Sequence, residues 1–294
     1  MSVRGIWLTG MAILGFAAPA AAQVEAVDLF RLGAQELASG LVDKAVETFE
    51  RAVQLKPDAK EGWYNLGVAY GRKKAIAKEV QAYHKALELD PNYVNALHNL
   101  GLAYQDLGQK DKAVETLQKA VKADPNAGDS WNNLGVVLLD KGELAQAADA
   151  FRKAGPLMTT SAEPRYNLGI TLLRLAEKET STDRREPVLR DAVRAVDDAL
   201  AVDPKHFRAA YNKGILLHKL GDSAGELAAF KAAIQIKPDY FQALYNLAAA
   251  MSDKGDKDAA IRAWEEYVKA AGGDPTERPF VENARKELTR LRSL

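Results

Sequence analysis

The fold is decided by a stretch of 34 residues, from Lys60 to Tyr93, which reads KEGWYNLGVAYGRKKAIAKEVQAYHKALELDPNY. Its Leu66-Gly67 pair recurs in steps of 34 residues, at Leu32-Gly33, Leu100-Gly101, Leu134-Gly135 and Leu168-Gly169. Prolines keep the same step at Pro57, Pro91 and Pro125, and again from Pro204 to Pro238. A fixed period of this length predicts a stack of repeated units rather than one globular core.

Each period contains two amphipathic segments, which predict two helices. A glycine at the eighth position and a small residue at the twentieth allow these helices to approach closely, as Gly135 and Ala147 do in the fourth period. Proline then ends the second helix, because it has no N–H to continue the hydrogen-bond ladder. One pair of helices cannot bury its own apolar face, so neighbouring pairs must stack. We therefore expect an all-α fold.

The pattern resembles the tetratricopeptide repeat, W-x2-L-G-x2-Y followed by A-x3-F and a closing proline. The second period matches at Trp63, Leu66, Gly67, Tyr70, Tyr83, Ala86 and Pro91. The fourth matches at Trp131, Leu134, Gly135, Ala147, Phe151 and Ala154. The resemblance covers residues 26–272 and implies a right-handed superhelical solenoid of about seven repeats. A further amphipathic helix after Pro275, with its apolar stripe at Phe280, Val281, Ala284, Leu288 and Leu291, is expected to cap the stack.

The predicted boundaries follow from this register. The repeats span residues 26–59, 60–93, 94–127, 128–161, 162–206, 207–240 and 241–274, and the capping helix spans 276–294. The fifth repeat holds 11 extra residues around 177–187, which predict a solvated loop or extended helix ends. In the fourth repeat, Gly155-Pro156 is expected to end the second helix early and create a joint before the fifth. Glu79 and Glu226 at the twentieth position are expected to splay their helices or shift the register.

Residues 1–22, MSVRGIWLTGMAILGFAAPAAA, have the three parts of a secretory signal peptide. Arg4 precedes an apolar run, and small residues end it. We expect cleavage after Ala22, which predicts an exported protein, periplasmic or secreted. An uncleaved membrane anchor is the alternative, although the run is shorter than the roughly 20 residues of a typical span. With no cysteine in the chain, the protein cannot carry an N-terminal lipid on that residue.

Composition excludes several classes of function. The chain has 40 basic and 40 acidic residues, so its zero net charge predicts no general attraction to nucleic acid. The absence of cysteine removes thiolate metal sites and thiol nucleophiles. The four histidines are scattered, and no phosphate-binding or nucleophile motif occurs. We expect no enzyme activity, no metal, no cofactor and no small-molecule substrate.

The resemblance also implies a binding surface. In the family, the first helix of each repeat lines a concave groove, with positions two, five, six, nine, twelve and thirteen directed towards the ligand. Positions five and six supply the candidate partner-binding residues Tyr64, Asn65, Asn99, Asn133, Tyr166, Asn167, Tyr211, Asn212, Tyr245 and Asn246. Asparagine can donate and accept, so it suits a peptide backbone, and tyrosine adds contact area with a polar tip. The alternative is that the asparagines hold neighbouring helices together.

Position nine is apolar throughout, and the family's carboxylate clamp, Lys at five with Asn at nine, does not occur. A partly apolar extended segment or a partner helix is therefore the expected ligand. These features predict a non-catalytic scaffold or adaptor of the bacterial-type cell envelope that binds other proteins or peptides. A periplasmic chaperone or assembly factor for exported clients, in cytochrome maturation or secretion-machine assembly, is the alternative, and a self-assembling structural protein comes third. Membrane contact is expected only through an uncleaved signal segment.

Overall fold

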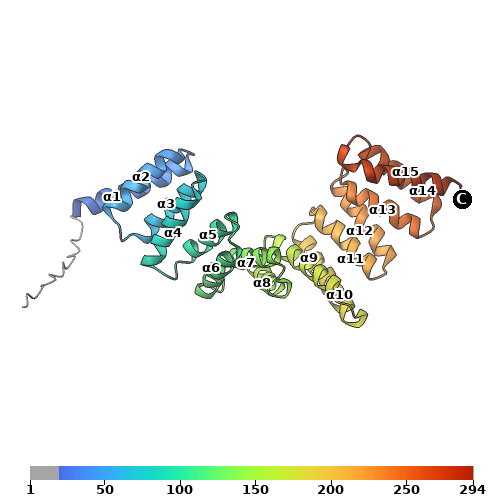
Figure 1. Cartoon of the computed structure of the whole chain (residues 1–294), viewed down its shortest axis with the longest axis horizontal. Coiled ribbons are helices and arrows are strands. Elements are labelled where there is room, and N and C mark those ends of the chain that lie inside the picture. Colours follow the sequence, from blue (N-terminus) through green and yellow to red (C-terminus); the bar gives the residue numbers. More distant parts are fainter. Residues whose placement is uncertain (1–19, 294) are drawn as a thin grey trace, which may run out of the picture. The chain divides into compact units, whose positions relative to one another are not determined.

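The computed structural model describes residues 20–293, and this part of the chain is all-helical (Figure 1). The α-helices are arranged as helix-turn-helix pairs followed by a last helix. The bounds of the helices in the first four pairs are α1 Ala20–Ala38, α2 Val42–Leu55, α3 Lys60–Arg72, α4 Ile76–Leu89, α5 Val94–Asp106, α6 Lys110–Ala123, α7 Gly128–Lys141 and α8 Leu144–Leu157. The later helices are α9 Glu163–Lys178, α10 Thr182–Val202, α11 Phe207–Lys219, α12 Ser223–Ile236, α13 Phe241–Asp253, α14 Lys257–Ala271, the 3-10 helix η1 Pro275–Glu277 and α15 Arg278–Ser293.

Within a pair, an aromatic ring fills the space that a glycine leaves. A Cβ atom on Gly67 of α3 would lie 2.4 Å from the ring of Tyr83, and one on Gly135 of α7 would lie 2.6 Å from the ring of Phe151. Tyr83 and Phe151 are 2% and 0% exposed. The Leu-Gly signature thus marks the point where the two helices of a pair cross most closely, which is why it recurs with the repeat.

In six of the seven repeats, the turn inside the pair holds one left-handed residue, at the fifteenth position. Glycine takes it in five repeats, with positive φ at Gly40, Gly108, Gly142, Gly221 and Gly255. In the second repeat the same place is taken by Lys74, with φ 61°. Glycine adopts this conformation without a steric penalty, whereas a residue with a Cβ atom, such as Lys74, is strained in it.

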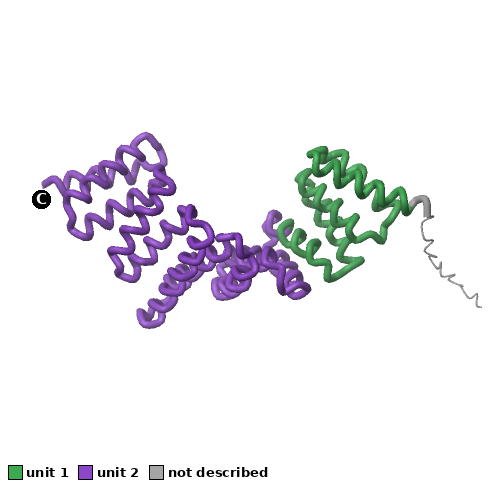
Figure 2. Tube along the Cα trace, turned by 180° about the vertical axis from the view of Figure 1, so that it is seen from behind, with its two compact units in different colours: residues 1–103 green, residues 104–294 purple. Residues whose placement is uncertain are grey.

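The chain forms two compact units, residues 1–103 and 104–294 (Figure 2). In the first, the core is built around Phe49, Leu66 and Tyr70, where α2 packs on α3. In the second, each second helix from α6 to α14 packs against the first helix that follows it. The boundary between the units falls inside α5.

The expected joint after the fourth repeat was wrong. Helix α8 has 14 residues, as α6 and α12 do, and it packs extensively against α9. Pro156 lies inside its last turn and is exposed. A proline so close to the end removes a single backbone donor, and the N–H of Met158 still bonds the carbonyl of Ala154 at 2.9 Å.

The other departures from the repeat are absorbed locally. The extra residues of the fifth repeat lengthen α9 to 16 residues and α10 to 21, leaving only residues 179–181 between them. The glutamates at the twentieth position do not splay their helices, since α3 and α11 pack on their partners as extensively as in other pairs. Gly71 leaves room for the Glu79 carboxylate, and His218 Nδ1 lies 3.1 Å from buried Glu226.

The two ends of the described chain differ from the expected boundaries. Helix α1 begins at Ala20, before the expected array start at Ala26, and the signal-peptide prediction for residues 1–22 falls mostly outside the described residues. At the other end, α15 packs on α14 and buries Val281 and Leu288, whereas Phe280 is 52% exposed. No helix in residues 20–293 is long and apolar enough to cross a membrane.

Candidate functional site on the first helices

Tyrosine and asparagine side chains link the first helices of neighbouring repeats. The Nδ2 atom of Asn246 donates to the Tyr211 hydroxyl at 3.0 Å, 35 residues earlier in the chain. We call such a pair, a tyrosine at position five and an asparagine at position six of the next repeat, a rung. The others are Asn99 to Tyr64 at 3.3 Å, Asn212 to Tyr166 at 3.3 Å and Asn283 to Tyr245 at 2.7 Å. We call these four hydrogen-bonded pairs the closed rungs.

The tyrosine rings of the rungs are also packed among other rings. Tyr211 lies 5.7 Å from Phe230 and 5.1 Å from Tyr240, and Tyr245 lies 4.9 Å from Trp264 and 5.3 Å from Tyr267. Burial raises the pKa of the Tyr211 phenol, so this hydroxyl stays protonated at neutral pH. These tyrosines therefore stabilise the stack, whatever else they contact.

At three places the rung spacing occurs without a tyrosine. The residue 35 before Asn65 is Phe30, the residue 35 before Asn133 is His98, and the residue 35 before Asn167 is Asn132. His98 and Asn133 each have an interaction partner. Helices α1 and α3, and helices α7 and α9, are in contact, as are α9 and α11, which carry the hydrogen-bonded pair of Tyr166 and Asn212. Phe30 has no hydroxyl. The Oδ1 atom of Asn132 is buried and has no hydrogen-bond partner in the described chain. We call the Asn132/Asn167 pair the open rung.

A second buried atom without a hydrogen bond, in the part that the structure describes, is Nε2 of His206. His206 is 8% exposed, its Nδ1 accepts from the N–H of Ala209 at 3.1 Å, and its ring lies 4.7 Å from that of Tyr166. Glu163 Oε1 lies 3.5 Å from the Nε2 atom. The two unsatisfied atoms therefore sit on α7 and just before α11, the first-helix neighbours of α9.

Near α9, the positive charge of Arg208 is offset by the negative charge of Glu163. Arg208 stands 5.7 Å from the centre of the Tyr166 ring and 3.8 Å from Glu163. The apolar residues at position nine of α7 and α9, Val136 and Ile170, are half-buried. This face thus offers free amide groups beside apolar side chains, and no dense charge. In residues 20–293 no group of acidic, histidine or cysteine side chains could hold a metal ion.

The predicted site residues have different surroundings in the structure. All ten are half-buried. Seven of them form the closed rungs: Tyr64, Asn99, Tyr166, Asn212, Tyr211, Asn246 and Tyr245. Asn65, Asn133 and Asn167 stand where a tyrosine is missing, and of these Asn133 has an interaction partner of its own.

Sequence reasoning missed three residues of this face, Asn132, His206 and Asn283. A signal for Asn283 was present. It follows Pro275 by eight residues, as Asn246 follows Pro238, so α15 takes the place of a first helix in an eighth unit. Nothing in the sequence marks the loss of hydrogen bonds at Asn132 and His206.

Family comparisons agree with the repeat architecture. Models described as tetratricopeptide repeat match residues 98–156, 189–241, 61–93 and 242–271, and one described as TPR repeat matches 33–74 and 80–108. Together they cover most of the chain. The chain is a tetratricopeptide repeat (TPR) protein. Between residues 33 and 271 the matches leave out residues 157–188, which include the extra residues in the fifth repeat of this TPR protein.

Solved structures with the same fold include other TPR proteins. YrrB, described as a TPR protein with an unusual peptide-binding site, is 25% identical, with a TM-score of 0.59 over 68% of this chain and 98% of YrrB. The C-terminal part of a TPR protein from Cytophaga hutchinsonii is 15% identical, with a TM-score of 0.68 over 84% and 97%. PilF of Pseudomonas aeruginosa is 18% identical, with a TM-score of 0.59 over 74% and 94%. No curated protein matches the sequence.

Proposed function

We propose that this TPR protein is a non-catalytic scaffold that binds extended segments of partner proteins along its first helices, with the open rung as the main contact. The observation that carries the proposal is the buried Oδ1 atom of Asn132, which has no hydrogen-bond partner. A buried acceptor left unsatisfied costs about 1–3 kcal/mol. A partner N–H group that reaches this atom would remove the cost.

The chemistry of the open rung suits a peptide backbone. Asn132 supplies an acceptor and Asn167 an amide that can donate and accept. Val136 and Ile170, one helical turn further along α7 and α9, favour an apolar side chain on the partner. YrrB, described as having a peptide-binding site, has a similar fold, which supports a peptide as the ligand.

The site of action is part of the proposal. Residues 1–22 have the pattern of a signal peptide, so we place the protein in the periplasm or outside the cell, with Gln23 as the first residue of the mature chain. Mass spectrometry of the protein from its native compartment tests this. An intact N-terminus would instead indicate a retained anchor.

The binding proposal is tested by closing the open rung. In an Asn132→Tyr variant, the new ring is expected to pack towards Phe151 and its hydroxyl to accept from Asn167, as in the other rungs. The variant and the unchanged protein serve as baits in extract of the cell envelope, with exposed Lys231→Glu as the matched control. We expect a partner on the unchanged and control baits and its loss from Asn132→Tyr.

Retention of the partner by a folded Asn132→Tyr bait would remove the open rung from the binding site. Stable capture of no protein by any bait would contradict the scaffold function. Thermal unfolding separates loss of binding from loss of structure, because closing the rung should leave the melting temperature unchanged or raise it.

A further inference from the structure

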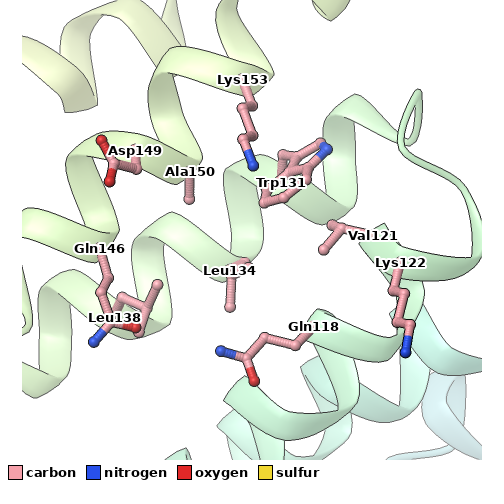
Figure 3. A pocket seen from close by; sticks show the side chains of 10 residues that line it. All are labelled: Gln118, Val121, Lys122, Trp131, Leu134, Leu138, Gln146, Asp149, Ala150 and Lys153. Carbon is pink, nitrogen blue, oxygen red and sulfur yellow. The ribbon is translucent and has the colours of Figure 1, made fainter.

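A pocket on the opposite side of α7 is used by none of the rungs. It lies between α6, α7 and α8, wholly within the second unit, and has a volume of about 370 Å³ (Figure 3). Its floor is apolar and consists of Val121, Trp131, Leu134 and Leu138. We call it the Trp131 pocket.

The indole of Trp131 is held in a fixed position. Its Nε1 atom donates to the carbonyl oxygen of Pro125 at 2.9 Å, which fixes the edge of the ring. The Lys153 ammonium stands over the ring, 4.2 Å from its centre (Figure 3). The ring is half-buried, so part of its surface is available to a ligand without any rearrangement of the helices.

The rim of the pocket has an excess of free positive charge. Lys122 on α6 and Lys153 on α8 stand on different walls, and neither forms an ion pair in the described chain (Figure 3). The acid at the pocket, Asp149, is bound to Arg152 at 2.7 Å. Two unpaired ammonium groups beside an aromatic floor favour a ligand that brings carboxylates next to an apolar side chain.

The second repeat provides a comparison within the same chain. A pocket of about 390 Å³ lies at the same repeat positions, with Trp63 in place of Trp131 and Lys85 in place of Lys153. The Nε1 atom of Trp63 likewise donates to the carbonyl of Pro57 at 2.9 Å. There, however, Lys85 is paired with Glu88 at 2.6 Å. An unpaired lysine over the indole ring thus distinguishes the Trp131 pocket from the pocket at Trp63.

We propose that the Trp131 pocket is a second docking site, separate from the first-helix face, for an acidic peptide segment with an aromatic or large aliphatic anchor. The volume of the pocket suits such an anchor, because a cavity of about 150 Å³ already holds a benzene ring, and the Trp131 pocket leaves room for the adjoining backbone as well. The anchor contacts the floor beside Trp131, and flanking carboxylates meet Lys122 and Lys153.

The test selects peptides without assuming their sequence. Random peptides of 12 residues are displayed and selected on the purified protein, and the enriched peptides are synthesised. We expect an aromatic or leucine residue next to aspartate or glutamate. Affinities are then measured for a Lys122→Glu/Lys153→Glu variant and for a matched control, Lys178→Glu/Lys231→Glu, which reverses two exposed lysines of the same unit.

Reversal of the rim is expected to weaken binding about tenfold, and the control should bind like the unchanged protein. A Trp131→Phe variant, with its fold checked by circular dichroism, should also bind more weakly. The Asn132→Tyr variant should bind these peptides normally, which separates this pocket from the open rung. Absence of acidic peptides with an aromatic or large aliphatic residue from the enriched set, or affinity of such peptides unchanged by the rim reversal, would overturn the proposal.

Discussion

Removing a single hydroxyl group should measure what a closed rung contributes to stability. In a Tyr211→Phe variant the ring contacts with Phe230 and Tyr240 remain, and only the hydrogen bond from Asn246, 3.0 Å long, is lost. A neutral hydrogen bond contributes about 0.5–1.5 kcal/mol. Because both side chains are half-buried and water can reach the freed amide, we expect the lower part of this range, about 0.5–1 kcal/mol.

A double-mutant cycle isolates the pair. Tyr211→Phe, Asn246→Ala and the double variant are unfolded in urea and followed by circular dichroism, and we expect a coupling free energy of about 0.5–1 kcal/mol. The matched control is the cycle of Asn132→Ala and Asn167→Ala at the open rung, where coupling should stay below about 0.3 kcal/mol. Coupling near zero at Tyr211 and Asn246, or equally large at the open rung, would refute the distinction between closed and open rungs.

Three further predictions concern the fold. Lys74→Gly should raise the free energy of unfolding by about 0.5–1 kcal/mol, because glycine adopts this left-handed conformation without a steric penalty, as in five other turns. Urea unfolding measures the change, and a loss of stability would contradict the prediction. Gly135→Ala should lower the melting temperature and reduce the free energy of unfolding by about 1–3 kcal/mol, because the new Cβ would lie 2.6 Å from the Phe151 ring. An unchanged melting temperature would show that α7 and α8 can move apart without loss of stability. The hydrogen bond from Lys60 lowers the pKa of Asp90 from 3.8, so ionised Asp90 stabilises the fold at higher pH and this contribution is lost as pH falls below 3.8. The Asp90→Asn variant should therefore lose less stability than the unchanged protein as the pH falls. Identical pH profiles of the two proteins would exclude the Lys60–Asp90 pair as a source of the acid sensitivity.

The architecture was predictable because it follows from local spacing. A glycine facing an aromatic ring, a turn and a closing proline recur with the period, so each repeat confirms the next. The capping helix was also predictable from its apolar stripe, although its part in the ladder through Asn283 was not read from the sequence.

Two local expectations failed for a common physical reason. The expectations for Pro156 and for the glutamates at position twenty rested on the properties of these residue types alone. Their effect on the helices depends instead on where they lie and on the residues around them. Pro156 lies in the last turn of α8, where the loss of one donor does not end the helix. Gly71 and His218 accommodate the two glutamates, and neither lies next to its glutamate in sequence.

The candidate site was only partly predictable. Positions five and six follow from the repeat register, and so does their half-burial. Which asparagines bond a tyrosine depends on the residue at position five of the preceding repeat, and that pairing becomes evident only once the stacking of the first helices is known. The Trp131 pocket was not predicted at all, because it brings together Lys122 and Lys153 from second helices of successive repeats.

The location of a partner segment on the first helices is tested most directly by photo-crosslinking in the cell. Benzoylphenylalanine is placed at Asp129 of α7 or Arg174 of α9, both exposed, and at exposed Lys231 of α12 as the control. The account predicts a covalent adduct with the same protein from positions 129 and 174, and none from 231. Adducts from 231 alone, or none from the first helices while a partner is captured, would contradict it.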